Sequence, residues 1–175
     1  MISTANRRMF LIAALILALD QATKNLVLQS LGPRDERIVI DGFFRLVNWS
    51  NTGAAWSLFP DRNVVLAWVS GAALAGLILG RRHFHIQTLA GQVSLGLICG
   101  GIAGNLIDRI NPLRHHVVDF LRFYLFTRGG AEVGFPAFNV ADSAICVGVG
   151  LLILVSCRLE PAVPARPAPE AGVEN

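Results

Sequence analysis

Four long apolar segments limit what this 175-residue chain can fold into. Each is close to the roughly 20 residues that an α-helix needs to cross the hydrocarbon core of a bilayer. More than half of all residues are apolar and only 15% are charged, which fits a membrane protein with several spans better than a soluble domain. We therefore predict a mainly α-helical, polytopic membrane protein with four transmembrane helices, at about 9–31, 64–80, 88–107 and 137–157.

The two ends of the chain differ in character. Near the start, Arg7 and Arg8 precede a short apolar run, as in a signal peptide, but no small-x-small cleavage motif follows and apolar residues resume at Leu26. We interpret this segment as a retained helix. At the other end, residues 160–175 are rich in Pro and Ala and predict a disordered tail. The remainder, 1–159, has room for a single membrane-embedded domain.

Basic residues near the helix ends predict the orientation in the membrane. The ends that must share one side are flanked by Arg7, Arg8, Arg81, Arg82 and Arg158. The opposite loops, 32–63 and 108–136, carry four arginines each, but the positive-inside rule is strongest for short connections such as 81–87. We therefore expect both termini in the cytoplasm and both long loops at the outer face of the membrane.

The first outer loop contains a predicted β region at about 36–59. β-branched and aromatic residues lie on both sides of Asp41-Gly42, a dipeptide that favours the positive φ angles of a tight hairpin turn. Trp49 and Trp56 suit the headgroup level, where amphipathic rings settle. We expect a small antiparallel sheet on the membrane surface.

The third apolar segment carries a small-residue face and a polar face. Glycines recur every four residues from Gly96 to Gly104, a spacing that lets another helix approach closely. Asp108 follows near the C-terminal end, where the helix dipole disfavours a carboxylate, so we expect a cationic partner for it. The alternative is that Asn105, Asp108 and Arg109 only mark the aqueous boundary of the helix.

Lys24 is the only lysine in the chain. It follows Asp20 by one helical turn, so the two residues predict an intrahelical ion pair that tethers the helix end at the interface. A serine–lysine protease would use such a lysine as its base. Ser30, Ser50 and Ser57 stand in no recognisable arrangement with it, so this class is disfavoured.

Two aspartates stand in otherwise apolar stretches, Asp119 within 115–121 and Asp142 within 138–144. A carboxylate at the edge of a bilayer is costly to keep charged. Two carboxyl groups that converge on one spot share a proton, the arrangement with which an aspartyl protease activates water. Simpler accounts stay open, because Asn139 and Asp142 fit a helix capping box and Asp119 fits a solvated loop residue.

Other functional classes fit the sequence less well. The arginines are scattered, which disfavours nucleic-acid binding, and the odd number of cysteines, all in apolar runs, disfavours a disulfide framework. The histidine pairs at 83–85 and 115–116 lack the spacing of a metal hydrolase, so we expect no metal. The main alternative is a small transporter that uses Asp20, Asp108 and Asp142 as an ion or proton relay.

Five short motifs occur in order: Asp-Gln-Ala-Thr-Lys (20–24), Asn-Thr-Gly-Ala-Ala-Trp (51–56), Gly-Gly-Ile-Ala-Gly-Asn-Leu-Ile-Asp-Arg (100–109), Val-Val-Asp-Phe (117–120) and Phe-Asn-Val-Ala-Asp-Ser (138–143). Together they resemble the bacterial lipoprotein signal peptidase, signal peptidase II, over about residues 9–157. The resemblance implies an inner-membrane aspartyl endopeptidase that removes the signal peptide of diacylglyceryl-modified prolipoproteins, cutting just before the lipidated cysteine. It also implies four helices with a small outer β-cradle and a short outer helix. We expect a monomer without a cofactor, whose partners are prolipoprotein signal peptides and membrane lipid.

The resemblance assigns roles to individual residues. Its two catalytic aspartates belong to the Val-x-Asp-Phe and Asn-x-Ala-Asp motifs, here Asp119 and Asp142, one acting as base and the other as acid. The supporting residues that it implies are Asp20, Lys24, Asn51, Asn105, Asp108, Arg109, Asn139 and Ala141. From their chemistry alone, Asn51, Gly53 and Ala54 suit an extended peptide, with an amide to hold its backbone and small residues to let it approach.

Three features depart from the family pattern. Trp56 stands where the motif usually has Phe, and His116 stands where a Gly commonly precedes Val-Val-Asp. The stretch 122–136 is long and contains Gly129-Gly130, so we expect a Gly-rich loop that acts as a lid. None of the three involves the aspartates, and all of them bear on substrate choice.

Overall fold

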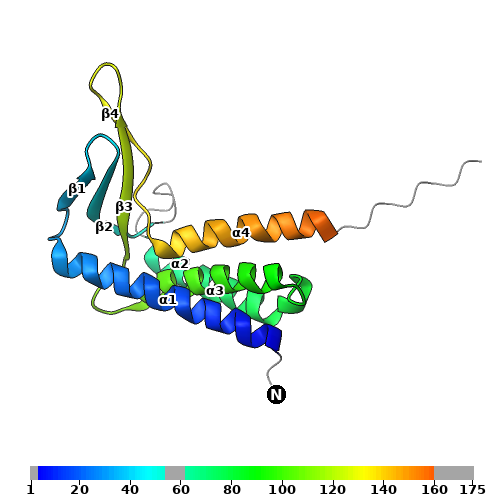
Figure 1. Ribbon diagram of the computed structural model, residues 1–175. Helices are drawn as coiled ribbons and strands as arrows, with labels where there is room; N and C mark the ends of the chain where they lie inside the picture. The colour runs from blue at the N-terminus through cyan, green and yellow to red at the C-terminus, as the bar shows by residue number, and fades with distance from the viewer. Residues whose placement is uncertain (1–3, 54–61, 160–175) are drawn as a thin grey trace, which may run out of the picture.

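The computed structural model describes residues 4–53 and 62–159. Four α-helices, α1 (Thr4–Ser30), α2 (Asn63–Leu79), α3 (Leu89–Ile110) and α4 (Val140–Leu159), lie alongside one another, and the 3₁₀ turn η2 (Arg81–His83) follows α2. A small antiparallel sheet stands at one end of the helices, as Figure 1 shows. The start of α1 and the end of α4 lie at the opposite end.

The helix α3 is the centre of the helical layer, since α1, α2 and α4 all pack on it. The predicted glycine face meets α1: a Cβ built on Gly96 would lie 2.7 Å from Ile12 Cβ, and one on Gly100 would lie 2.7 Å from the carbonyl oxygen of Ala13. On the side of α4, a Cβ on Gly101 would lie 2.5 Å from the carbonyl oxygen of Ala141. Because these glycines have no side chain, the backbones of α1, α3 and α4 approach one another closely at the level of the predicted site.

Three of the helices, α1, α3 and α4, are long and apolar enough to cross a membrane. The helix α2 is also apolar but has 17 residues, so the fourth predicted span remains a prediction. The predicted bounds need two corrections of consequence. The helix α3 continues to Ile110, so Asp108 and Arg109 lie within it, and α4 begins at Val140 rather than 137 because Asn139 caps it.

The sheet has the strand order β1 (Glu36–Ile40), β2 (Phe44–Asn51), β3 (Val117–Phe126) and β4 (Glu132–Gly134). The predicted hairpin turn at Asp41-Gly42 is confirmed, because it joins β1 to β2 and Gly42 has a φ of 70°. In the β2–β3 ladder Trp49 pairs with Asp119, and a register shift lies between Leu46 and Trp49. The long inner strand β3 thus brings the Val-Val-Asp-Phe motif to the ends of the helices.

The segment 108–136, predicted as an outer loop with a Gly-rich lid, contains two β-strands. Residues 122–136 form most of a β-hairpin, with Gly129-Gly130 at its tip, and β3 is an inner strand of the sheet. The run from Val117 to Phe126 is rich in β-branched and aromatic residues, which favour a pleated, half-buried surface. No α-helix joins β3 to α4, and the short outer helix is not found within residues 4–53 and 62–159. Positions 54–59 of the predicted β region, with Trp56, lie outside the described residues.

Two arginines hold the outer hairpins together across the sheet. Arg45 of β2 and Arg122 of β3 both pair with Glu132 of β4. The guanidinium of Arg45 also lies 4.2 Å from the ring centroid of Tyr124, and that of Arg122 lies 4.3 Å from the ring of Trp49. Each guanidinium group thus combines an ion pair with a ring contact, which helps the sheet to support Asp119.

Candidate active site

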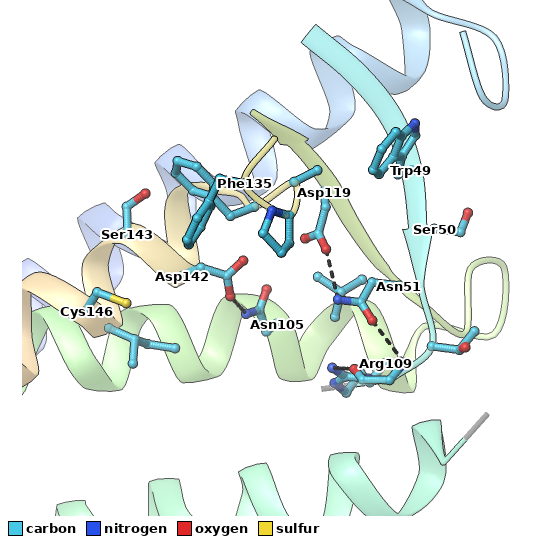
Figure 2. Close-up of a pocket in the computed structure, with 17 residues that line it drawn as sticks. Trp49, Ser50, Asn51, Asn105, Arg109, Asp119, Phe135, Asp142, Ser143 and Cys146 are labelled. Atoms are coloured by element: carbon cyan, nitrogen blue, oxygen red, sulfur yellow. Dashed lines mark hydrogen bonds between the residues drawn. The ribbon is translucent and has the colours of Figure 1, made fainter. Parts of the chain in front are cut away.

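Asp119 and Asp142 face the same cavity at the junction of the sheet and the helices (Figure 2). Asp119 comes from β3 and Asp142 from the first turn of α4. The cavity has a volume of about 630 Å³, within the range of pockets that hold small ligands or a few residues of peptide. The expected convergence of the two aspartates is therefore what the fold produces.

Asp119 is held by two asparagine amides. Asn51 donates to its Oδ2 at 2.9 Å and Asn139 donates to its Oδ1 at 2.8 Å. The residue is only 4% exposed. Burial, and after it the charge of Asp142, raise the pKa of Asp119 to about 7, although both amide donors act in the opposite direction. Asp119 is therefore a carboxyl group that can hold or release a proton near neutral pH, which a solvated loop residue would not be.

Asp142 takes part in a helix cap and in the cavity at the same time. Its backbone N–H donates to Asn139 Oδ1 at 2.9 Å, and its Oδ2 accepts from the backbone N–H of Asn139 at 3.2 Å. These two bonds are the capping box that the sequence predicts. Its other oxygen, Oδ1, accepts from Asn105 Nδ2 at 2.7 Å, and the side chain lines the cavity. The capping account is thus correct and does not exclude a chemical role.

Three asparagines present N–H groups to the two carboxyl groups, and a donor on the oxygen side fixes the direction of each amide. The amide oxygen of Asn51 accepts from the backbone N–H of Gly53, and that of Asn139 accepts from the backbone N–H of Asp142, both at 2.9 Å. The amide oxygen of Asn105 accepts from Lys24 Nζ at 2.9 Å. With its oxygen engaged in this way, each amide turns its nitrogen toward a carboxylate.

A second cluster of charges lies behind the cavity and is completely buried. Lys24 Nζ lies 2.8 Å from Asp20 Oδ2 and 2.6 Å from Asp108 Oδ2, and all three side chains are 0% exposed. Asp20 also accepts from the backbone N–H of Ala141 at 3.0 Å, which ties α1 to the first turn of α4. The predicted ion pair of Asp20 and the predicted cationic partner of Asp108 are both confirmed. Arg114, 3.1 Å from Asp108, is a further partner that the sequence analysis missed.

Arg109 follows Asp108 in α3 and, unlike it, lines the cavity. Its Nη2 donates to the carbonyl oxygen of Gly53 at 2.7 Å, and its Nη1 donates to Asn63 Oδ1 at 3.0 Å. The arginine thus ties the segment after β2 to the start of α2. Gly53 was expected to let a peptide approach, and its carbonyl is engaged with Arg109. The adjacent Ala54 lies outside the described residues.

The rest of the cavity wall is largely apolar and was not predicted. It includes Trp49, Val117, Phe135, Phe138, Ile145 and Cys146. Ile145 and Cys146 follow Asp142 by three and four residues, so helical spacing alone would have placed them on its face. In the described parts of the chain, no group of three His, Cys, Asp or Glu side chains is placed to hold a metal ion. The arrangement offers two carboxyl groups with amide donors at one wall and surface for apolar side chains at the other.

Comparison with known proteins agrees with this arrangement. Residues 12–158 match the family model described as signal peptidase (SPase) II. The lipoprotein signal peptidase of Syntrophotalea carbinolica is 37% identical over 155 residues, which are 87% of this chain and 92% of that protein. The one of Symbiobacterium thermophilum is 40% identical over 143 residues, 82% and 90% of the two chains.

Solved structures show the same fold. A bacterial membrane enzyme determined by the in meso method at 2.3 Å resolution superimposes with a TM-score of 0.71 and 29% identity, covering 89% of this chain and 93% of the other. A second bacterial membrane enzyme, at 1.9 Å, gives a TM-score of 0.67 and 30% identity over 87% and 94%. The family match spans nearly all of the described residues and includes both aspartates, the three asparagines and the buried charges. The chain therefore belongs to the signal peptidase II family of membrane proteases.

Proposed function

We propose that this protein is an aspartyl endopeptidase that cuts diacylglyceryl-modified prolipoproteins just before the lipidated cysteine. Family membership supports the processing of prolipoprotein signal peptides. The observation that carries the aspartyl mechanism is the pair Asp119 and Asp142 in one cavity, each held by amide donors and not by a cation. Two such carboxyl groups are enough to take a proton from water and to pass it to a leaving amine.

In the mechanism that we propose, Asp142 is the base and Asp119 is the acid. Asp142 lies in the first turn of α4, where the helix dipole favours a negative charge. Asp119 is the more enclosed residue, and its raised pKa favours the protonated form at neutral pH. Asp142 takes a proton from a water molecule, whose oxygen attacks the scissile carbonyl carbon, while Asp119 passes its proton to the carbonyl oxygen to give a tetrahedral diol. The proton on Asp142 then passes to the leaving nitrogen as the C–N bond breaks, and Asp119 recovers its own proton.

The apolar wall of the cavity suits the substrate that we propose. Phe135, Phe138 and Ile145 provide surface for small apolar side chains of an extended peptide. Two acyl chains on the cysteine add capture energy of about 0.8 kcal/mol for each methylene that leaves water. Lipid on the substrate is therefore expected to dominate binding, and an unlipidated peptide is expected to be a poor substrate.

We further propose that the enzyme is one membrane domain, residues 1–159, with a cytoplasmic tail from 160, and that it acts as a monomer. In this arrangement α2 is the fourth span, and the sheet and cavity lie at the outer face of the inner membrane. The start of α1 and the end of α4 at the end remote from the sheet support a common side for both termini (Figure 1). The carboxyl groups gather near the sheet and not at the middle of repeated helices, which disfavours the transporter alternative.

The experiment is cleavage of a diacylglyceryl-modified lipobox peptide by the purified protein in detergent. Mass spectrometry of the products locates the cut, and we expect it before the lipidated cysteine. Turnover should persist in a strong chelator and after treatment with serine-directed reagents. A peptide mimic with a hydroxyl at the scissile position should compete. Loss of turnover in the chelator with recovery on addition of zinc would overturn the aspartyl assignment, and equal turnover of the unlipidated peptide would overturn the substrate class.

A further inference from the structure

Lys24 is enclosed on every side, and its ammonium group has three acceptors. Asp20 Oδ2 lies 2.8 Å, Asn105 Oδ1 2.9 Å and Asp108 Oδ2 2.6 Å from its Nζ. Two of these contacts are hydrogen bonds, to Asp20 and Asn105, and the contact with Asp108 is an ion pair. Lys24 does not line the cavity, so it does not reach the peptide. Charge pairing explains the two carboxylates and leaves the bond to Asn105 without an explanation.

The amide of Asn105 connects Lys24 to the dyad. Its oxygen accepts from Lys24 and, at 3.3 Å, from Asn139 Nδ2, and its nitrogen donates to Asp142 Oδ1 at 2.7 Å. An asparagine amide can rotate by half a turn at little steric cost, because its nitrogen and oxygen have nearly the same shape. In the rotated form an amide oxygen would face the carboxylate of Asp142 and repel its charge. The two donors on the oxygen side, above all the charged one, prevent that rotation.

We propose that Lys24 is a positioning residue: by holding the amide oxygen of Asn105, it keeps an N–H directed at Asp142 and so keeps that carboxylate in its ionised, water-activating form. This inference rests on the proposed function, and it goes beyond the ion pair with Asp20. It gives Lys24 an effect on the chemistry without contact with the substrate. The line of contacts runs from α1 through α3 to α4.

Four other charged groups act on Asp142, and three of them stay unchanged in every variant used to test Lys24. Asp119 of β3 acts on it across the cavity, Asp20 of α1 lies behind it, and Arg109 of α3 is close enough to interact electrostatically. The fourth is Lys24 itself, whose charge also favours the ionised carboxylate. The role of the hydrogen bond through Asn105 can therefore be separated from simple charge only by removing Asn105 as well as Lys24.

The test is the pH profile of kcat for the lipidated peptide, between about pH 4 and 9, for a set of variants. Lys24→Met alone leaves two buried carboxylates without their cation, so it is made in the Asp108→Asn background, and Asp108→Asn alone is the matched control. Asn105→Ala removes the connecting amide and keeps every charge. The fourth variant combines Asn105→Ala with Lys24→Met/Asp108→Asn. Thermal unfolding in detergent verifies that each variant is folded.

We expect the acidic limb of the profile to move up by about one pH unit in Asn105→Ala and in Lys24→Met/Asp108→Asn. The first variant removes the N–H that stabilises the charge on Asp142, and the second lets the amide rotate that N–H away. The combined variant should shift by less than the sum of the two shifts, because only the lost charge of Lys24 then adds to the loss of the amide. The control should keep the limb of the unsubstituted protein, and KM of the Lys24 variant should stay within about twofold of the control. A purely structural lysine would lower activity and leave the limb in place.

An unmoved limb in Asn105→Ala or in Lys24→Met/Asp108→Asn would overturn the proposal. So would shifts that add fully in the combined variant. If the Lys24 variant does not fold, Asn105→Ala decides alone, since the proposal requires its limb to move. Asp142→Asn is measured in the same assay to separate the proposed mechanism from the proposed role of Lys24. An active Asp142→Asn enzyme would remove the proposed mechanism itself, whereas an inactive one with an unmoved limb in the other variants would remove only the role of Lys24.

Discussion

The protein holds two groups of carboxylates that Asn105 connects, and their partners differ in kind. Asp20 and Asp108 are sealed from solvent and share the ammonium of Lys24. Asp119 and Asp142 face a cavity and receive hydrogen bonds from neutral amides. A cation at contact distance holds a carboxylate in its charged form, whereas an amide donor orients it and leaves its proton exchangeable. Neutral partners therefore distinguish the pair that we propose to be reactive from the pair that is held by a cation.

The first way to test this contrast is to remove the carboxylates that have only neutral partners. Asp119→Asn and Asp142→Asn should each lower kcat by at least about a thousandfold, because an amide cannot take or pass the proton. The double variant should be barely worse than either single one, since groups in one constellation act as a unit. Turnover of the lipidated peptide is measured beside thermal unfolding in detergent. Near-normal turnover in one single variant would remove that residue from the mechanism.

Removal of the shared cation tests the group of carboxylates that is paired by charge. Lys24→Met should lower the free energy of unfolding by about 3–5 kcal/mol, because it leaves Asp20 and Asp108 buried without their shared cation. Adding Asp108→Asn should recover part of the loss. The measurement is unfolding in detergent, by heat or denaturant. A Lys24→Met protein as stable as the unsubstituted one would contradict the assignment of this cluster as structural.

The pH dependence of stability provides a third test, which concerns the Asp119 carboxyl group alone. Asp119 has a pKa of about 7 when folded and an ordinary value of 3.8, so folding binds a proton between these values and stability falls as pH rises from about 4 to 7. Asp119→Asn lacks this loss. We expect this variant to be more stable than the unsubstituted protein by about 2 kcal/mol at pH 8. The gain is smaller than the full pKa shift of Asp119 implies, because the new NH₂ group faces one of the two amide donors. At pH 4 the gain should be absent, and a gain independent of pH would show that the Asp119 carboxyl is not the cause.

The smallest effects are expected at the edge of the charged cluster. Arg114 contacts Asp108 at 3.1 Å and its side chain is 17% exposed, so Arg114→Gln should cost no more than about 1 kcal/mol of unfolding free energy while Lys24 remains. Asp108→Asn should lower turnover less than tenfold, because Asp108 does not reach the cavity. Both are measured with the assays above. A loss in Asp108→Asn as large as that in Asp142→Asn would mean that the two groups of carboxylates are not distinct.

Local sequence rules predicted a large part of this contrast. Asp20 and Lys24 were paired from helical spacing, the capping box of Asn139 and Asp142 from its own signature, and Asp119 from its apolar surroundings. Each of these rules uses residues within a few positions of one another. The family resemblance then named the supporting asparagines without stating what they contact.

What could not be predicted depends on contacts between distant parts of the chain. Lys24 and Asn105 are 81 positions apart, and Arg109 and Asn63 are 46 positions apart. No local sequence pattern indicates hydrogen bonds over such separations. The strand β3 was missed for another reason. It lies between two predicted membrane spans and was counted with the loop 108–136, although its β-branched and aromatic residues favour a strand.

The double use of Asn139 has a consequence for biosynthesis. The same side chain starts α4 and holds Asp119, so the last described helix and the dyad are completed in one step. A chain released before residue 139, or one whose final segment has not yet entered the bilayer, carries Asp119 without its partner and without one of its two amide donors. On the proposed mechanism, the growing polypeptide cannot hydrolyse a prolipoprotein until α4 is in place.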